Sequence, residues 1–296
     1  MKAIFSIDVE EWFHLTDTET LSRDIEEWDL YPSRVEETFK ELITILDKHN
    51  IKATCFFVGW IAEKYPELVS LAYKKGHEIG VHGYYHRLVF KQTYDEFYKE
   101  ILKTKTLIEG IIDDKVYSFR APSFSIESQN LWAYKILMEL GFKYSSSIHP
   151  GKYKEFGLFP KVINYDKMKI IEIPLPILKF PFSSLSCFGG GYFRLFPLFW
   201  YNIAIKFIKN VPLTFYIHPR DIDLKHPNVK MPLKRKFKSL VNVKSTKKKI
   251  ESILDKNDFA PLFEVIDELE KDKLQHTTLC ISTNSVYSLS EHSVSD

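Results

Sequence analysis

The chain has 296 residues, of which 45% are hydrophobic and 27% are charged. This composition can build a large buried core and excludes an intrinsically disordered chain, and a net charge of +2 provides no global field to attract nucleic acid. Three cysteines without C-x-x-C spacing fit neither a disulfide framework nor a cysteine zinc site. We expect one large domain with decorations.

Strands and helices alternate in the first half. Strands are expected over residues 2–9, 53–59, 77–83 and 116–122, and helices over 33–50, 62–76, 94–112 and 128–141. Ser33 and Glu36 have the spacing of a capping box for the first helix. The second half is less regular, with strands expected over 169–177 and 212–219. Such alternation predicts βαβ units and a largely parallel sheet, either a barrel or a doubly wound layer.

Two segments bear on membranes. The amino terminus has an apolar stretch that Asp8 cuts short, which predicts no signal peptide and a cytoplasmic protein. Residues 195–208 are apolar but contain Pro197, Asn202 and Lys206 and are too short to span a bilayer. A buried helix is favoured there over an interfacial membrane element.

The carboxyl-terminal part is basic and then polar. Nine Lys and Arg residues occur from Lys230 to Lys249, with Phe237 as the only aromatic among them, so nucleic acid is not expected as a partner. A solvated face is favoured over contact with anionic lipid or glycan phosphate. Residues 289–296 are polar and are expected to fray.

Acids, histidines and one arginine recur where the expected strands end, which is where reactive groups gather in parallel α/β folds. They are Asp8, Glu10, His82, His86, Arg120 and His218. Alternate residues of a strand point the same way, so Asp8 and Glu10 can face one side. The spacing of His82 and His86 would place both imidazoles on one side of a helical turn.

These residue types are those of a metal-dependent hydrolase. Two histidines and one carboxylate make a three-ligand site with a position left open for water, which a divalent ion makes a nucleophile. A second acid would serve as base, and a separate histidine could protonate the leaving group. Either Asp8 or Glu10 can be the ligand and the other the base. Each element alone also fits a structural role; their order together favours a hydrolase.

The motifs "SIDVEEWF", "HGYYH", "RAPSF" and "FYIHP" resemble those of the polysaccharide deacetylase family, carbohydrate esterase family four, also called the NodB homology domain. A narrower likeness, in "DVEEWF", "GGGYFRLFP" and "HPRDID", is to the branch associated with exopolysaccharide biosynthesis loci. The resemblance implies a distorted, often incomplete (β/α) barrel over residues 1–225. Residues 226–296 would then be a basic linker and a carboxyl-terminal helical extension packed on the barrel.

The resemblance also implies roles. Asp8 would be the base, His218 the acid, and Glu10, His82 and His86 the ligands of a divalent metal, with zinc favoured. Arg120 would keep Asp8 ionised. The Ser123 backbone N–H would help to stabilise the oxyanion. The other residues expected to bind substrate are Phe124, Tyr192 and Arg194, with the glycines of "GGGYF" letting the backbone approach a sugar.

Two positions depart from the family pattern. Glu10 stands where most relatives have an aspartate ligand, and Ser145 stands where an aspartate that orients the late histidine is expected. Asp221 or Asp223 could replace that aspartate.

The implied reaction removes acetyl from an N-acetylated sugar, and the alternatives are an inactive glycan-binding relative and an amidase for a small cyclic amide or imide. The sugar could belong to a polysaccharide, an oligosaccharide or a lipid-linked precursor. Residues 195–208 and the basic stretch favour a lipid-linked substrate, with peripheral contact at the inner membrane face.

Overall fold

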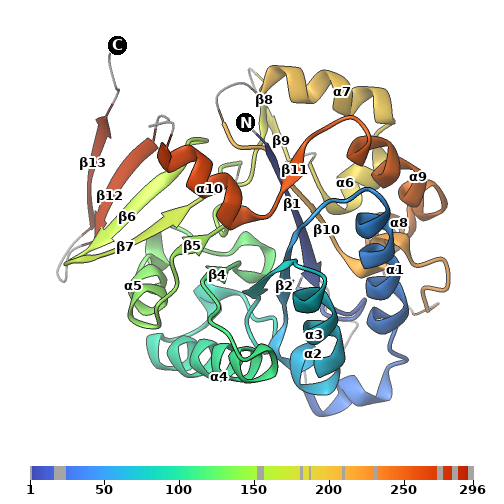
Figure 1. The fold of residues 1–296 in the computed structure, drawn as a ribbon, viewed down its shortest axis with the longest axis horizontal. Helices are drawn as coiled ribbons and strands as arrows, with labels where there is room; N and C mark the ends of the chain where they lie inside the picture. Colours follow the sequence, from blue (N-terminus) through green and yellow to red (C-terminus); the bar gives the residue numbers. More distant parts are fainter. Residues whose placement is uncertain are drawn as a thin grey trace.

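The computed structural model describes residues 2–16, 25–151, 157–180, 183–186, 188–208, 211–227, 229, 232–271, 276–281 and 286–292 (Figure 1). The strands are β1 (Ala3–Val9), β2 (Thr54–Phe57), β3 (Glu78–Val81), β4 (Ser118–Phe119), β5 (Tyr144–Ser145), β6 (Lys161–Tyr165), β7 (Met168–Glu172), β8 (Leu178–Phe180), β9 (Ser183–Leu185), β10 (Thr214–Ile217), β11 (Phe259–Ala260), β12 (His276–Ile281) and β13 (Val286–His292). The helices are α1 (Val35–Lys48), α2 (Gly59–Lys64), α3 (Pro66–Lys74), α4 (Tyr94–Ile112), α5 (Trp132–Glu139), α6 (Gly190–Leu195), α7 (Leu198–Phe207), α8 (Leu233–Leu240), α9 (Val243–Leu254) and α10 (Leu262–Lys271).

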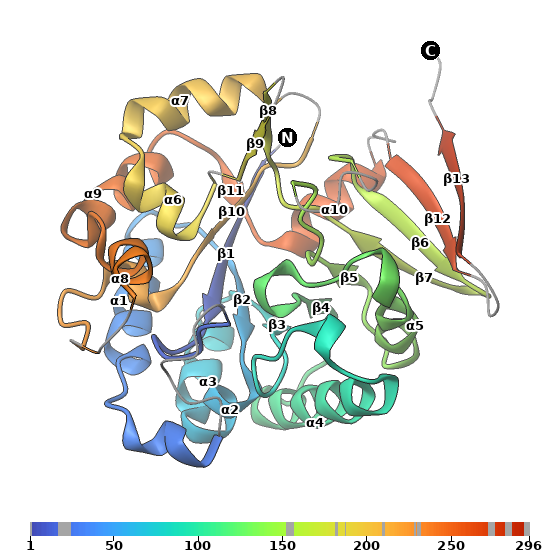
Figure 2. The same ribbon diagram turned by 180° about the vertical axis from the view of Figure 1, so that it is seen from behind.

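One curled mixed sheet forms the frame, in the order β10-β1-β2-β3-β4-β5-β7-β6-β12-β13, with β11 beside the start of β1. The run from β10 to β7 is parallel, whereas β6 is antiparallel to β7 and β13 to β12. Helices cover the outside of the curl, and the sheet does not close, since β10 and β13 are its two edges (Figures 1 and 2). The expected distorted, incomplete (β/α) barrel is therefore confirmed.

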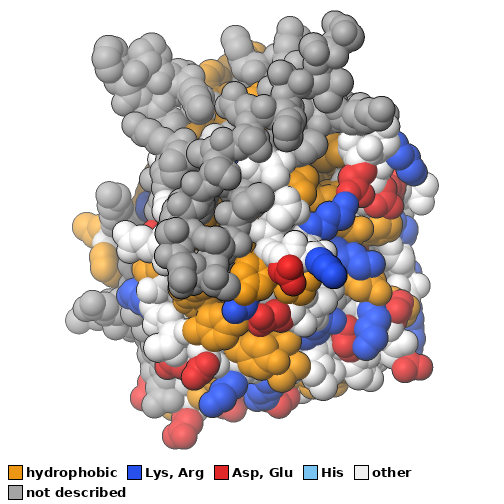
Figure 3. Space-filling model, turned by 90° about the vertical axis from the view of Figure 1, so that its left-hand side faces the viewer, with side chains coloured by type: hydrophobic (Ala, Val, Ile, Leu, Met, Phe, Trp, Pro, Cys, Tyr) orange, Lys and Arg blue, Asp and Glu red, His pale blue; other side chains and the backbone are white. Residues whose placement is uncertain are grey.

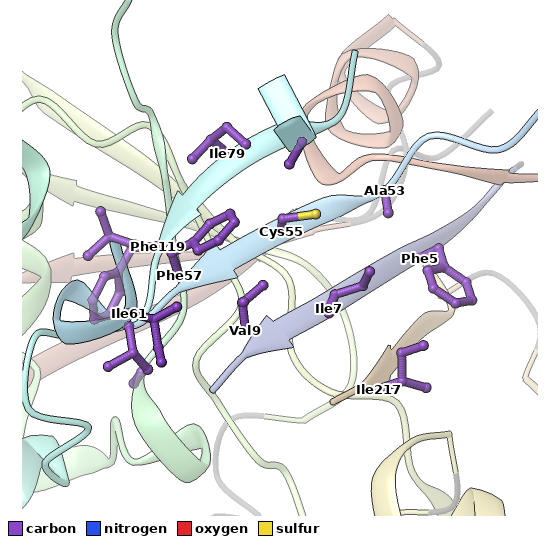
Figure 4. Packing of buried hydrophobic residues seen from close by; sticks show 14 of the residues in the cluster. Phe5, Ile7, Val9, Ala53, Cys55, Phe57, Ile61, Ile79, Phe119 and Ile217 are labelled. Carbon is purple, nitrogen blue, oxygen red and sulfur yellow. The ribbon is translucent and has the colours of Figure 1, made fainter. Parts of the chain in front are cut away.

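The two faces of β1 show how the sequence builds this half-barrel. Phe5, Ile7 and Val9 point outward into the main core beneath the helices, together with residues of β2 such as Cys55 and Phe57 (Figure 4). The alternate residues of β1 belong to the inner face. There Ile4 joins a second apolar cluster, while Ser6 and Asp8 bind Arg120. The inside of the half-barrel is thus apolar at the amino ends of the strands and polar at their carboxyl ends.

The carboxyl-terminal part is more than a helical extension. Helix α10 packs Leu262, Val265, Ile266 and Leu269 into the inner apolar cluster and so fills the bottom of the half-barrel. β11 pairs with β1, and β12 pairs with β6, so strands from this part enter the main sheet. The boundary at residue 225 stays a prediction. β13 occupies part of the segment expected to fray, and residues 293–296 lie outside the described residues.

Local differences from the expected elements have physical causes. The single helix expected over 62–76 is two helices, because Pro66 cannot donate the hydrogen bond that would continue α2. The capping box expected from Ser33 and Glu36 does not form. The Glu11 carboxylate instead accepts from the backbone N–H groups of Arg34 and Val35, at 2.9 and 3.1 Å, and so caps α1 from the end of β1.

The apolar segment 195–208 forms α7, with the last residue of α6 before it, and it is only half buried. Tyr201 and Ala204 are buried, whereas Phe199 and Ile203 are 64% and 42% exposed, so the expectation of a buried helix is only partly met. Among the described helices, none has the length and apolar character that crossing a membrane would require.

Candidate active site

A cavity of about 650 Å³ opens at the carboxyl ends of the inner strands. The predicted residues that line it are Asp8, Glu10, His82, His86, Ser123, Phe124, Tyr192, Arg194 and His218. Arg120 lies beneath it and is fully buried. The structure therefore brings every predicted site residue to this one place, although not all of them have the expected surroundings.

Asp8 and Arg120 form the floor of the cavity. The Arg120 guanidinium donates to Asp8 Oδ1 at 2.8 Å and to Ser6 Oγ at 2.7 Å, and its other nitrogens donate to the carbonyl and hydroxyl of Ser146. Burial alone would raise the pKa of Asp8, but the positive charge of Arg120, with smaller contributions from His82 and His218, lowers it. Asp8 is therefore held as a buried carboxylate with one oxygen, Oδ2, left for other partners.

Glu10, His82 and His86 offer three ligand atoms that all lie within 4.8 Å of one another, and all three residues are buried. His82 Nδ1 lies 2.8 Å from the Arg120 carbonyl oxygen, which can only accept, so Nδ1 carries the proton and the Nε2 lone pair is free for an ion. Glu10 Oε2 lies beside His86 Nε2. Three buried ligand atoms this close together fit a divalent cation.

The loop that carries the two histidines is not the helical turn expected from their spacing. Gly83 and His86 have positive φ values of 71° and 50°, and residues 82–88 form no helix. Glu100 on α4 fixes this turn, because its carboxylate accepts from the backbone N–H groups of Tyr84 and Tyr85 at 2.8 and 3.1 Å. A Cβ on Gly83 would lie 3.1 Å from that carboxylate. The sequence analysis missed this role of Glu100.

His218 follows β10 and faces both acids. Its Nε2 lies 3.5 Å from Glu10 Oε1 and 3.9 Å from Asp8 Oδ2. Asp221, in a 3₁₀ turn over Pro219–Ile222, accepts from His218 Nδ1 at 2.9 Å and from its backbone N–H at 2.8 Å. Of the two aspartates considered as replacements, Asp221 therefore orients His218.

The remaining candidates for that role have other partners. Asp223 pairs with Arg34 at 2.9 Å. Ser145 bonds Ser147, with 2.8 Å between their hydroxyl oxygens.

Two arginines complete the charge pattern. Arg194 Nε lies 2.9 Å from Asp221 Oδ1, and its terminal nitrogens donate to the carbonyls of Lys238 and Ser239. Arg220 contacts Glu10 Oε1. Burial alone would raise the pKa values of Glu10 and Asp221, yet both are lowered, Glu10 chiefly by Arg220 and Asp221 by His218 and Arg194. The sequence analysis missed Arg220 although "HPRDID" contains it.

The "RAPSF" turn is backbone of unusual shape. Ser123 and Phe124 both have positive φ, 55° and 52°, which L-residues seldom adopt and which marks a functional constraint in many sites. The Ser123 hydroxyl lies 2.7 Å from the Thr16 hydroxyl, and the Phe124 ring packs against Tyr216 and near the Arg120 guanidinium. This turn forms part of the cavity wall.

The "GGGYF" segment differs from expectation. Gly189 closely approaches the chain's own strand β10, since a Cβ there would lie 2.4 Å from the Tyr216 carbonyl oxygen. Tyr192 is 45% exposed at the cavity, where a substrate could reach it. Arg194 was expected to bind substrate as well, but only 3% of it is exposed because Asp221 and the carbonyls of α8 hold it. Its surroundings are those of a residue that positions Asp221.

Comparisons with known proteins agree with this arrangement. Residues 27–145 match the family described as polysaccharide deacetylase, and residues 146–267 match a domain of unknown function, DUF3473. A peptidoglycan-N-acetylglucosamine deacetylase of Bacillus cereus is 39% identical over 93 residues, which are 30% of this chain and 34% of the relative. The deacetylase PgdA of Listeria monocytogenes is 28% identical over 128 residues, 41% of this chain and 26% of the relative. The matches thus span about a third or less of the curated relatives' length.

Solved structures show the same fold at low identity. A Mycobacterium smegmatis protein provisionally described as a polysaccharide deacetylase matches with a TM-score of 0.63 and 16% identity, over 99% of this chain and 94% of that one. Puue allantoinase matches with a TM-score of 0.61 and 12% identity, over 91% and 90%. A pseudoenzyme of carbohydrate esterase family four from Bacillus anthracis matches with a TM-score of 0.51 and 15% identity, over 90% of this chain and 66% of that one.

Proposed function

Because these matches support the polysaccharide deacetylase family and a hydrolytic deacetylase, we propose that the chain is a metal-dependent enzyme that removes acetyl from an N-acetylated sugar. The observation that carries the proposal is the cavity itself. Asp8, the ligand set of Glu10, His82 and His86, and the His218–Asp221 pair all line it. We extend the proposal to a cytoplasmic role in exopolysaccharide biosynthesis, in keeping with the "DVEEWF" and "HPRDID" motifs.

Asp8 is the base in this proposal. Its lowered pKa keeps it ionised at neutral pH, and Oδ2 is the oxygen that Arg120 does not bind, so it can accept a proton from water in the cavity. Glu10 follows β1 and lies beside His86 and His82, and this position supports its role as the ligand. The sequence left open which of Asp8 and Glu10 is the base. The proposal assigns this role to Asp8, because Arg120 binds Asp8.

His218 is the acid. Asp221 accepts from Nδ1, so Nε2 is the nitrogen that faces the cavity and can protonate the departing amine. The "RAPSF" turn would present the Ser123 backbone N–H to the developing oxyanion, and Phe124 and Tyr192 would contact the sugar ring. The place of these residues in the cavity wall supports both roles.

The three ligand residues fit zinc, since imidazole nitrogen and carboxylate oxygen are donors that it accepts in catalytic sites. A bound divalent ion would supply Lewis-acid chemistry, polarising the acetamide carbonyl and making water more acidic.

A small cyclic amide is the second candidate substrate. A protein with the same fold, Puue allantoinase, bears the name of an enzyme for such a compound. An open cavity of about 650 Å³ with an exposed tyrosine at its rim favours the larger sugar substrate. An inactive glycan-binding relative is disfavoured, because the residues proposed as base, ligands and acid lie together and have the partners that these roles require.

The test is acetate release from N-acetylglucosamine oligomers together with bound metal, measured on wild type, Asp8→Asn and His82→Ala. We expect both variants to lose acetate release, whereas only His82→Ala loses metal. His77→Gln is the matched control, since His77 is buried but lies outside the cavity, and it should keep both properties. Full metal content without acetate release from any acetylated sugar would refute the proposal, and turnover of cyclic amides would then select the second candidate.

A further inference from the structure

Helix α8 presents an apolar face to solvent. Leu233, Phe237 and Leu240 are 86%, 58% and 41% exposed, and their spacing of four and then three residues places them on one side of the helix. An amphipathic helix normally turns its apolar side to the core. Among the residues of α8 whose side chains are described, Ser239 alone is buried, so the helix is turned the other way.

Helix α6 continues this apolar surface toward the cavity. Tyr192 and Leu195 are 45% and 38% exposed. Arg194 ties the two helices together, because it donates to the carbonyl oxygens of Lys238 at 2.6 Å and Ser239 at 2.7 Å. We call Tyr192, Leu195, Leu233, Phe237 and Leu240 the α6–α8 face; the first two and Phe237 also line the cavity.

The stretch of sequence that carries α8 has charge of one sign. From Leu224 to Ile250 the sequence contains ten Lys and Arg and no Asp or Glu. Of the residues in it whose side chains are described, Lys236, Lys238, Lys244 and Lys248 are exposed. The opposite side of the molecule differs, since the hydrophobic side chains visible there have both acidic and basic neighbours (Figure 3).

Exposed apolar side chains with lysines beside them complement an anionic bilayer. The apolar side chains can enter the acyl-chain region, and the lysines can contact the negatively charged headgroups. A polysaccharide would also stack on Tyr192 and Phe237, but it gives no role to Leu233 and Leu240, whose aliphatic side chains do not stack on sugar rings. Helix α7, which begins three residues after α6 ends, also has exposed apolar residues, Phe199 and Ile203.

We propose that the α6–α8 face docks on an anionic lipid bilayer, and that the acetylated sugar entering the cavity is carried by a lipid in that bilayer. The second half rests on the proposed function. The cavity wall supports a lipid-borne sugar, because Leu195 and Phe237 belong both to the exposed face and to the lining of the cavity that contains His218. A lipid chain can therefore stay at the face while the sugar reaches the acids.

The docking is tested by flotation with vesicles of phosphatidylglycerol and phosphatidylcholine, or of phosphatidylcholine alone. Leu233→Ser with Leu240→Ser removes apolar contacts outside the cavity lining, and Lys236→Glu reverses one charge. Leu30→Ser with Leu102→Ser, and Lys99→Glu, are the matched controls, because these residues are also exposed but lie on other elements. Equal thermal unfolding of all variants is checked first.

Wild type should float with anionic vesicles at low salt and much less at high salt. The double leucine variant should bind at least tenfold more weakly, and Lys236→Glu about fivefold or more, while both controls match wild type. Absence of flotation, or equal flotation of the leucine variant and wild type, would overturn the docking. So would a wild-type dimer that the leucine variant abolishes, because a second copy would then cover the face.

The lipid-borne substrate is tested by acetate release from soluble N-acetylglucosamine oligomers and from hexadecyl N-acetylglucosaminide in the same vesicles. The leucine variant should lose at least tenfold on the vesicle-borne sugar and keep its rate on the soluble one. Equal loss on both substrates would overturn this step. If wild type floats but hydrolyses neither sugar, the proposed function fails while the docking stands.

Discussion

Replacement of Asp221 by asparagine should impair catalysis without emptying the metal site. Asp221 accepts from His218 Nδ1 at 2.9 Å, and an asparagine keeps the shape but removes the negative charge. At an effective dielectric constant of about 20, an imidazolium and a carboxylate at this separation attract each other by about 6 kcal/mol. Arg194 shares the carboxylate, and an amide oxygen still accepts, so the net loss is smaller. We expect kcat/KM to fall by about 10²- to 10³-fold.

The assay is acetate release, with bound metal measured alongside. Asp221 is not one of the three ligand residues, so metal content should stay at the wild-type level in Asp221→Asn while the rate falls.

Asp223→Asn is the control, since Asp223 lies two residues further along and pairs with Arg34 instead of His218. It should keep the wild-type rate. The reasoning is refuted if Asp221→Asn retains full activity, or if both variants lose activity equally. In Asp221→Asn the buried Arg194 also loses its carboxylate partner, which will lower the stability of the fold. Activities are therefore compared only below the unfolding transition of each variant.

Three further predictions concern the scaffold. Glu11→Ala should destabilise the fold by about 2 kcal/mol in urea titrations, because two backbone donors at the start of α1 lose their acceptor, whereas Glu11→Gln should lose less. Burial lowers the pKa of His77 to about 4 from 6.5, so the unfolded chain takes up its proton first and stability should fall as pH drops from 6.5 to 4. That loss, up to about 3 kcal/mol, should be absent in His77→Gln. Gly189→Ala should reduce acetate release at least tenfold more than Gly110→Ala, because its Cβ would push against the Tyr216 carbonyl in the strand that carries His218.

The parts of the site that depend on strand alternation could be predicted from the sequence. Asp8 and Glu10 lie two residues apart at the end of a buried strand, so their shared face followed from the pleat alone. His82, Arg120 and His218 each follow a short apolar strand. Parallel pairing of β3, β4 and β10 with their neighbours brings the carboxyl ends of these strands together. The local sequence pattern is enough to predict that such residues share one site.

The parts that depend on loop geometry could not be predicted. Asp221 and Asp223 both follow His218 closely in the sequence. The 3₁₀ turn and the ion pair between Arg34 and Asp223 determine that Asp221 is the one that binds His218. The spacing of His82 and His86 is typical of a helix, yet positive φ values at Gly83 and His86 build a different turn. The capping of α1 by Glu11 joins residues far apart in sequence, so Ser33 and Glu36 were the nearer but wrong choice.

The site as a whole has a charge pattern that explains how three acids can be buried within it. Each carboxylate has its own guanidinium from a different part of the chain: Asp8 has Arg120, Glu10 has Arg220, and Asp221 has Arg194. Burial would raise all three pKa values, and these pairings are among the contacts that lower them instead. Asp8, Glu10 and Asp221 are consequently all ionised before any substrate arrives. In the proposed function these residues are the base, a metal ligand and the residue that orients the acid, so the fold itself sets the negative charges that the proposed reaction needs.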